Sequence, residues 1–309
     1  MHDHHIKIFT ATKGMALFRI IFGAVLISFS GIWVSLSGVA PEVSAFYRVF
    51  FGALLLFMAS LFAGELRRPR LVTIGLATVT ALMFAVDLWC WHSSISFIGP
   101  GLSTILANMQ VFILAGVSII FFRVPVSTPL LIAPPLAFGG LALIVWPEWQ
   151  TIGASFQKGV FLGLAAAFFY ALYLLSLRRL QRLYGGSSLF YPLMLVSAIS
   201  SILLGVLALL RNTSLAIPTS HSLGALVALA FLSQVVGWVL ITTSLPRVVP
   251  AVAGLALLLQ PALAFVWDVV IFQRPTTPLN WFGVALTIMA IYGGMAASNR
   301  KPMVSTITE

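Results

Sequence analysis

Two stretches of this sequence, spaced 150 residues apart, decide how the chain is predicted to fold. The first is SISFIGPGLSTILANMQVFILAGVSIIFFRVP, residues 94–125, and the second is SLPRVVPAVAGLALLLQPALAFVWDVVIFQRP, residues 244–275. The matched positions, which align without a gap, are Ser94 with Ser244, Pro100 with Pro250, Gln110 with Gln260, Phe122 with Phe272 and Pro125 with Pro275. A looser match at a spacing of 140 residues pairs Gly23 with Gly163 and Phe29 with Phe169. We interpret the pattern as an internal repeat; chance alignment of apolar helices is the alternative.

The composition of the whole chain indicates a membrane protein. Of its 309 residues, 60% are hydrophobic and only 8% are charged, and the mean hydropathy is +1.07. Soluble domains carry about 25% charged residues, so this chain has too few charges to cover its own surface in water. We therefore predict an integral, multi-pass membrane protein that is surrounded by the lipid bilayer.

The apolar segments have the length of membrane spans, because a helix needs about 20 residues to cross a bilayer. Ten segments qualify, at residues 14–37, 41–63, 71–95, 99–122, 126–146, 158–180, 188–210, 222–245, 248–271 and 279–297. They form two five-helix units, residues 14–146 and 158–297, between short cytoplasmic tails at residues 1–13 and 298–309. Since each unit has an odd number of spans, the second enters the membrane from the opposite side. This predicts an inverted repeat of the kind found in secondary transporters.

Basic residues predict the orientation of the chain. With the amino terminus inside, most of them fall on the cytoplasmic side, whereas Lys158, Arg211 and Arg274 fall outside. This asymmetry predicts that both termini are cytoplasmic. It also explains the formal charge of +10 without a nucleic-acid partner, because the basic residues are scattered among short loops. The expected location is a bacterial inner membrane.

The sequence contains no pattern typical of an enzyme. The single cysteine, Cys90, excludes a disulfide framework and cannot complete a metal cluster. No nucleotide-binding loop, hydrolase motif or metalloprotease motif occurs. We expect no catalytic residues, no metal and no cofactor. The first apolar segment is too long for a cleavable signal peptide and is expected to remain as the first helix.

Residues 41–48, PEVSAFYR, contain the pattern Pro-x-x-x-Ala-x-x-Arg, at Pro41, Ala45 and Arg48. Together with the five-plus-five arrangement and the proline-led repeats, this resembles the drug/metabolite transporter superfamily, EamA type. The resemblance covers nearly the whole chain and implies ten helices and the transport of small solutes. Among the family, the abundant midspan aromatic residues suggest the amino-acid exporters, including aromatic amino-acid exporters. Members often have a glutamate in the turn after the fourth and ninth spans. Here those positions are Arg123 and Gln273, which argues against a mechanism that needs those carboxylates.

Two charged residues lie deep inside predicted spans. At about 1.5 Å per residue, Arg48 lies about 10 Å from the outer end of the second span, and Asp87 about 12 Å from that of the third. An ion pair would satisfy both charges, and Glu42 is a second potential partner nearer the surface. Alternatively, Arg48 contacts a substrate carboxylate and Asp87 a substrate ammonium group. The sequence leaves both interpretations open.

Uncharged polar and aromatic residues near the middle of the spans complete the candidate site. The polar members, which either line a cavity or join helices, are Asn108, Gln110, Tyr170, Gln234 and Gln260. The aromatic and apolar members, which either line it or pack, are Phe29, Trp33, Phe84, Leu88, Trp91, Tyr173 and Trp238. Asn108 and Gln110 are about 200° apart on a helix, so they cannot both face one cavity. Thr104 shares the face of Asn108, and the repeat makes a symmetric role natural for Gln110 and Gln260.

Together these features predict a secondary transporter that exports amino acids, including aromatic or other neutral ones, or related small metabolites, by alternating access. A multidrug or other metabolite exporter is the alternative, and a membrane enzyme or receptor is a remote one. Proton coupling would need a titratable group, for which Asp87, Glu42, His92 and Asp268 are candidates. The sequence leaves the substrate, the coupling and the oligomeric state open, and it allows a monomer.

Overall fold

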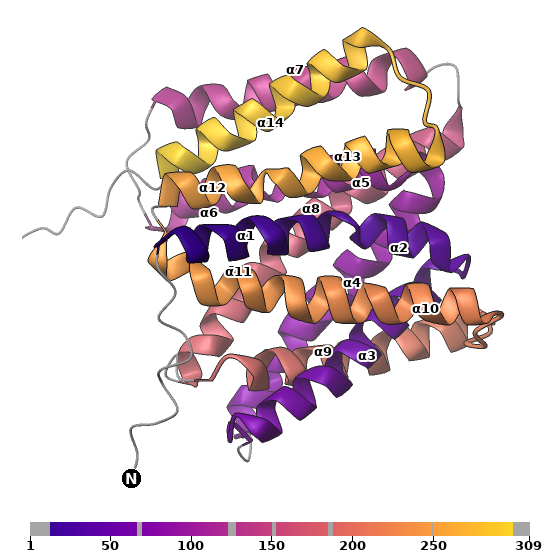
Figure 1. Cartoon of the computed structure of the whole chain (residues 1–309), viewed down its shortest axis with the longest axis vertical. Helices are drawn as coiled ribbons and strands as arrows, with labels where there is room; N and C mark the ends of the chain where they lie inside the picture. The colour runs from indigo at the N-terminus through magenta and orange to yellow at the C-terminus, as the bar shows by residue number, and fades with distance from the viewer. Residues whose placement is uncertain are drawn as a thin grey trace, which may run out of the picture.

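The computed structural model of the chain describes residues 13–66, 70–122, 128–149, 153–184, 188–248 and 250–298. Of the two expected tails, only residues 13 and 298 belong to this part, and Arg123 and Pro125 lie outside it. Every element in the described residues is a helix (Figure 1). The prediction of an all-α protein is therefore confirmed.

The helices follow the order of the expected spans, and four spans are built from more than one helix. The elements are α1 (Lys13–Ser28) with α2 (Ser30–Ser37), α3 (Pro41–Phe62), α4 (Leu71–Ile98), α5 (Pro100–Ala107) with α6 (Gln110–Phe122), α7 (Thr128–Trp149), α8 (Ala154–Leu183), α9 (Phe190–Leu210), α10 (Ser220–Ala228) with the π-helical η2 (Leu229–Gly237), α11 (Trp238–Ser244) and the 3-10 helix η3 (Leu245–Arg247), α12 (Pro250–Leu257) with α13 (Leu259–Phe272), and α14 (Pro278–Ser298). Within the described residues, 8 helical segments are long and apolar enough to cross a membrane. A shorter apolar stretch, Leu131–Pro147, lies within α7.

Large apolar side chains remain exposed on the outside of the bundle, as a bilayer requires. They come from helices throughout the chain and include Phe18, Phe62, Leu71, Phe121, Trp146, Phe161, Leu210 and Phe282. So much apolar surface would drive a protein to associate in water, whereas lipid chains cover it at no cost. The chain is accordingly a multi-pass membrane protein.

Two of the interrupted spans break at equivalent places. α5 gives way to α6 at Asn108, and α12 gives way to α13 at Leu258, 150 residues further on. At the first break, Nδ2 of Asn108 donates to the carbonyl oxygen of Thr104 at 2.8 Å. At the second, Pro261 has no amide hydrogen with which to continue the helical ladder. The spacing read from the sequence is thus present in the backbone.

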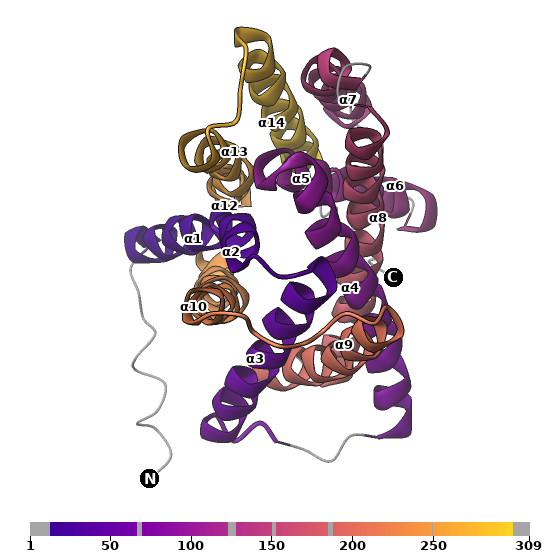
Figure 2. The same ribbon diagram turned by 90° about the vertical axis from the view of Figure 1, so that its right-hand side faces the viewer.

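The helices of the two halves pack in a pattern that is unchanged when the halves are exchanged. α4 packs on α8 and on α9; correspondingly, α11 packs on α1 and η2 packs on α3. Three further contacts join a helix to its own counterpart, namely α3 with α9, α5 with α13 and α7 with α14. Figure 2 shows α3 and α9 at one edge of the molecule and α7 and α14 at the other. This twofold pattern is the one expected for an inverted repeat.

The helices α3 and α9 also end in the same turn. Gly64 after α3 and Asn212 after α9 both have a left-handed backbone, with φ of 66° and 53°. The following amides, of Glu65 and Thr213, donate to Ser60 and Ala208 carbonyl oxygens at 2.9 Å and 2.8 Å. Both ends are therefore Schellman motifs. Glycine adopts this conformation without strain, and asparagine is the residue that most often replaces it.

Candidate functional site

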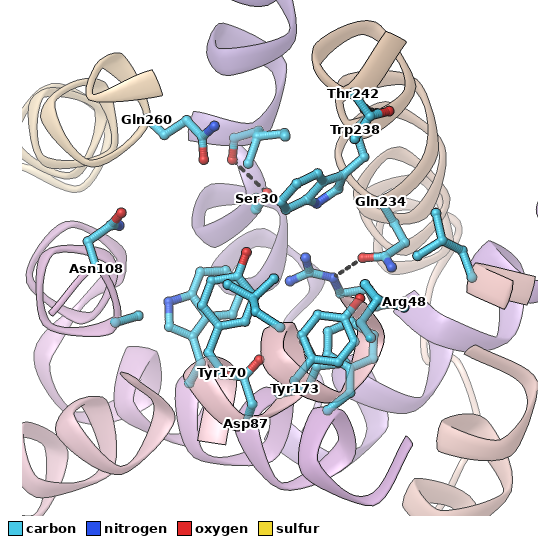
Figure 3. A pocket seen from close by; sticks show the side chains of 18 of the residues that line it. Ser30, Arg48, Asp87, Asn108, Tyr170, Tyr173, Gln234, Trp238, Thr242 and Gln260 are labelled. Carbon is cyan, nitrogen blue, oxygen red and sulfur yellow. Dashed lines mark hydrogen bonds between the residues drawn. The ribbon is translucent and has the colours of Figure 1, made fainter. Parts of the chain in front are cut away.

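A cavity of about 440 Å³ lies inside the bundle, and residues from both halves of the chain line it. Its wall contains most of the predicted site residues: Arg48, Phe84, Asp87, Leu88, Trp91, Asn108, Tyr170, Tyr173, Gln234, Trp238 and Gln260 (Figure 3). Side chains that are distant in the sequence are therefore brought together, with α3, α4, α5 and α8 on one side and η2, α11 and α13 on the other.

Phe29, Trp33 and Gln110 do not line the cavity. Phe29 stacks on Trp267 with the ring centroids 4.7 Å apart, and Trp33 packs in an apolar cluster with Trp91. Ile27 of α1 and Ser30 of α2, on either side of the break at Phe29, line the cavity instead. Position along the span matters as well as the face, because Trp33 lies one turn beyond Ser30 on nearly the same side of the helix and already packs against neighbouring helices.

Gln110 also departs from the symmetric role expected of it. Its repeat equivalent Gln260 lines the cavity, whereas Oε1 of Gln110 is buried and accepts no hydrogen bond from the described residues. Asn108 lines the cavity together with Thr104. Of these two residues, Asn108 therefore faces the cavity and Gln110 does not.

Arg48 is held by two contacts. Its Nε donates to Oε1 of Gln234 at 2.9 Å, and its Cζ lies 5.4 Å from the centroid of the Trp91 ring. A charged hydrogen bond and a cation–π contact both stabilise a guanidinium in a low-dielectric site. Only 8% of Arg48 is exposed, so these contacts replace most of its hydration.

The ion pair between Arg48 and Asp87, one of the two interpretations that the sequence left open, is not formed. Among the described residues, Asp87 has neither a salt bridge nor a hydrogen bond, although it lines the same cavity as Arg48 and is only 6% exposed. Glu42 is not a second partner of Arg48 either. It forms a salt bridge of 3.3 Å to Arg211 and accepts a hydrogen bond of 2.7 Å from Thr213. Arg48 is drawn toward the second half of the chain, which leaves Asp87 facing the cavity.

Gln234 reaches Arg48 from a π-helical segment. π-helical turns are rare in proteins and occur often at functional sites. Space for Gln234 is provided by Gly52 of α3, where an added Cβ would lie 3.0 Å from Cγ of Gln234. A glycine on one helix and a wide turn on another thus allow the two halves to approach at this point.

Aromatic rings form the wall on the side of α4 and α8. Phe84 and Tyr173 stack with ring centroids 4.3 Å apart, and Tyr170 and Tyr173 lie 5.9 Å apart with nearly parallel rings. Trp238, one helical turn after Gln234, lies on the opposite wall (Figure 3). A cavity of this size with aromatic walls and a few polar groups suits a small amphipathic solute.

The cavity extends to one end of the bundle, where its wall contains residues that the sequence did not predict. They come from the last turns of α8, the start of α9 with its preceding residue, and α11 with the following η3; they are Leu177, Arg178, Gln181, Leu189, Leu193, Thr242 and Leu245. Leu56, Ala107 and Leu174 are further lining residues that were not predicted. A signal was present in their spacing, because Gln234, Trp238 and Thr242 follow one another at four residues. Membrane depth, the feature that singles out Arg48 and Asp87, does not mark residues near a helix end.

The other end of the bundle is closed by polar contacts. Asp268 at the end of α13 forms a salt bridge of 3.3 Å to Arg274 and accepts a hydrogen bond of 3.1 Å from the Gly101 amide. Arg274 also donates to the carbonyl oxygen of Ile98 at 2.6 Å. Nearby, Nδ1 of His92 lies 2.7 Å from Oγ of Ser44, which joins α4 to α3. Asp268 and Glu42 are therefore occupied by structural contacts, whereas His92 uses Nδ1 and its buried Nε2 has no hydrogen-bond partner among the described residues; none of the three lines the cavity.

These features define a class of protein. Within the described residues, no group of three or more metal-ligating side chains gathers, and the cavity holds charged, aromatic and amide groups. An all-helical membrane protein whose two related halves enclose a cavity between broken helices has the architecture of a secondary transporter.

Comparison with known proteins agrees with this class. Residues 157–294 match the model of the EamA-like transporter family, so the resemblance noted in the sequence is confirmed, with the matched range in the second half of the chain. A solved structure described as "Crystal structure of protein" superposes with a TM-score of 0.66 at 15% sequence identity. The alignment covers 94% of this chain and 100% of that one, and at this identity it shows a shared fold. No curated protein matches the chain.

Proposed function

We propose that this protein is a secondary transporter that exports amino acids, including aromatic or other neutral ones, or related small metabolites, by alternating access. The observation that carries the proposal is the cavity itself. Its volume of about 440 Å³ lies within the range of small-molecule sites, and its wall combines aromatic rings with one acidic and one basic side chain at its centre. A free amino acid offers matching groups.

Alternating access is supported by the difference between the two ends of the bundle. The cavity reaches the end at which α8 stops, while the Asp268–Arg274 contacts close the opposite end. Basic residues gather near the first of these ends; the described ones are Lys13, Arg19, Arg70, Arg178, Arg179, Arg182 and Arg247. By the positive-inside rule that end is cytoplasmic, so the conformation is inward-facing.

We further propose that both termini lie in the cytoplasm of a bacterium, whose inner membrane the protein crosses. The boundaries of the two five-helix units, at residues 14–146 and 158–297, belong to the same proposal. Reporter fusions at each terminus test it, because a periplasmic alkaline phosphatase and a cytoplasmic fluorescent protein report opposite sides. Fluorescence from both fusions is expected, and a phosphatase-active fusion at either end would contradict the topology.

Transport is tested with the purified protein in proteoliposomes. Labelled amino acids are offered as a panel, with and without a pH gradient, and counterflow against an internal pool of the same amino acid is recorded. Saturable counterflow for at least one neutral or aromatic amino acid is expected. Dependence of accumulation on the pH gradient would identify proton coupling, and counterflow without it would identify a facilitator.

The same assay separates the alternatives. Flux of cationic dyes or of other metabolites, with no flux of amino acids, would favour a multidrug or general metabolite exporter. Absence of any flux from a correctly folded protein would favour a membrane enzyme or a receptor. We propose a non-enzymatic role without a metal or cofactor. A monomer is the proposed unit, since each chain contributes both halves of the cavity.

A further inference from the structure

We propose that Arg48 and Asp87 form a head-group site for a zwitterion, with the substrate carboxylate on Arg48 and its ammonium group on Asp87. This assignment rests on the proposed function, because it specifies how the amino acid is held in the same cavity. It differs from a mere charge pair, in which the two residues would neutralise one another.

Asp87 is a carboxylate without a cation in contact. It is 6% exposed and lines the cavity, and no hydrogen bond or salt bridge engages it among the described residues. An ionised carboxylate in a low-dielectric site is costly unless a cation or several donors accompany it. Figure 3 shows Asp87 beside Tyr170 and Tyr173 of α8, whose side chains are neutral. The ammonium group of a ligand would supply the partner that Asp87 lacks among the described residues.

Arg48 is positioned to bind an anion. Gln234 engages its Nε and Trp91 lies beneath its plane, so the orientation of the guanidinium is fixed. Within the described residues, no other hydrogen bond uses its terminal nitrogens. Figure 3 shows this end of the side chain turned into the cavity, on the same side as Asp87. A guanidinium held in this way presents a planar fork to a carboxylate.

The two opposite charges are kept apart by the fold. Arg48 is tied to Gln234 of the second half, whereas Asp87 belongs to α4 of the first half. The space between them is open to the cavity. A zwitterionic head group fills such a gap with both of its charges paired. The faces of Tyr170 and Tyr173 add a favourable surface for an ammonium group, since aromatic rings attract cations.

Three probes with one indole ring test the assignment. Tryptophan has both charges, indole-3-propionate lacks the ammonium group, and tryptamine lacks the carboxylate. Binding to the purified full-length protein in nanodiscs is measured by calorimetry. Each charge-assisted contact is expected to favour tryptophan over the corresponding analogue by roughly tenfold or more. If another amino acid is preferred in the transport panel, it and its two analogues replace the indole set.

The variants assign each charge to a residue. Asp87→Asn is expected to abolish the preference for tryptophan over indole-3-propionate while preserving its preference over tryptamine. Arg48→Gln is expected to do the reverse. If Arg48→Gln does not fold, the Asp87 arm alone decides. Glu42→Gln, which removes a buried carboxylate outside the cavity, serves as the matched control and is expected to leave both ratios unchanged.

Two results would overturn the assignment. An unchanged preference over indole-3-propionate in Asp87→Asn, with the affinities for all three probes retained, would show that the ammonium group is bound elsewhere. The same unchanged preference with an equal loss of affinity for all three probes would show that Asp87 has a structural role only. In either case amino-acid counterflow by the wild-type protein would leave the proposed function standing. Absence of counterflow for every amino acid would instead remove the proposed function and this assignment with it.

Discussion

Arg48 and Gln234, which are 186 residues apart in the chain, are joined by a hydrogen bond of 2.9 Å from Nε to Oε1. The bond connects α3 of the first half to the π-helical segment η2 of the second, inside the cavity. This bond holds the guanidinium away from Asp87. It thereby maintains the shape of the site.

Replacement of Gln234 by alanine is expected to lower transport by at least an order of magnitude. Without its acceptor, Arg48 is free to close on Asp87, and the charge pair then fills the space that a substrate needs. An unmet donor would cost about 1–3 kcal/mol, but the new ion pair offsets part of it, so the melting temperature in detergent should change little. Transport at the wild-type rate in Gln234→Ala would refute the role of this bond.

Gly52→Ala, a substitution in α3, is expected to disrupt the same hydrogen bond between Arg48 and Gln234. The added methyl group would lie 3.0 Å from Cγ of Gln234 and must push that side chain aside. We expect a clear loss of transport with a normal yield of folded protein. Gly75→Ala is the matched control, because nothing lies within 4 Å of a Cβ at that helical position. Equal behaviour of the two variants in the counterflow assay would contradict the prediction.

Gln260→Ala and Gln110→Ala compare two positions that the repeat makes equivalent. Gln260 lines the cavity and Gln110 does not. Removal of the Gln260 amide should therefore reduce transport several-fold, whereas Gln110→Ala should leave transport near the wild-type level. Initial rates at matched protein levels provide the measurement. A symmetric loss in both variants would mean that Gln110 faces the substrate in another conformation.

Asp268→Asn is expected to loosen the closed end of the bundle. The change removes the charge that faces Arg274 and weakens the acceptor of the Gly101 amide. A cysteine introduced at Thr104, in a Cys90→Ala background, should then react faster with an impermeant maleimide applied from outside. Gln273→Gly is the control, since Gln273 has a left-handed backbone that glycine tolerates and, within the part of the chain that the structure describes, its side chain donates only to Val270. An unchanged labelling rate in Asp268→Asn would show that other contacts keep this end closed.

Glu65 gives a prediction about stability and pH. Its carboxylate accepts hydrogen bonds from the Ser188 hydroxyl and from the amides of Leu189, Phe190 and Tyr191 at the start of α9. Burial alone would raise the pKa of Glu65, but these hydrogen bonds outweigh burial and hold the pKa below its ordinary value. The stabilisation is therefore present above the unfolded-state pKa and is lost as the pH falls through the lower folded-state pKa.

Glu65→Gln should accordingly lower the free energy of unfolding near neutral pH by about 1 kcal/mol, the usual value of a helix cap. The difference from the wild-type protein should disappear in acid. Melting temperatures in detergent between neutral pH and about pH 3.5 test this, because the ordinary glutamate pKa is about 4.3. A difference that persists unchanged in acid would contradict the assigned role.

The sequence was sufficient to predict the spans and the repeat. Both depend on one-dimensional properties: the thickness of a bilayer sets the span length, and the 150-residue register brings the breaks at Asn108 and Leu258 to equivalent positions. Arg48 and Asp87 could be predicted as site residues because a charge at membrane depth is conspicuous in any sequence. The side chains that surround them in the cavity could not all be predicted. Helix rotation decides which stripe faces a cavity, and for Phe29 and Trp33 polarity gave no information about it.

The hydrogen-bond and ion-pair partners of the charged residues could not be predicted from the sequence either. Proximity on consecutive helices suggested that Arg48 would pair with Asp87, whereas the fold brings in Gln234 from the other half. The salt bridge of Asp268 to Arg274 is local, yet its contacts with Ile98 and Gly101 reach across 150 residues or more. Such contacts depend on lateral packing of helices, which composition and periodicity leave undetermined.

The matching turns at Gly64 and Asn212 allow each half of the molecule to serve as a control for the other. One backbone geometry is built at opposite faces, with glycine in one copy and asparagine in the other. Exchanging the two residues keeps the overall composition constant, so any change in behaviour reports the surroundings of each turn and not the amino acid. In a protein with an internal repeat, the same turn can therefore be compared in two surroundings within one polypeptide.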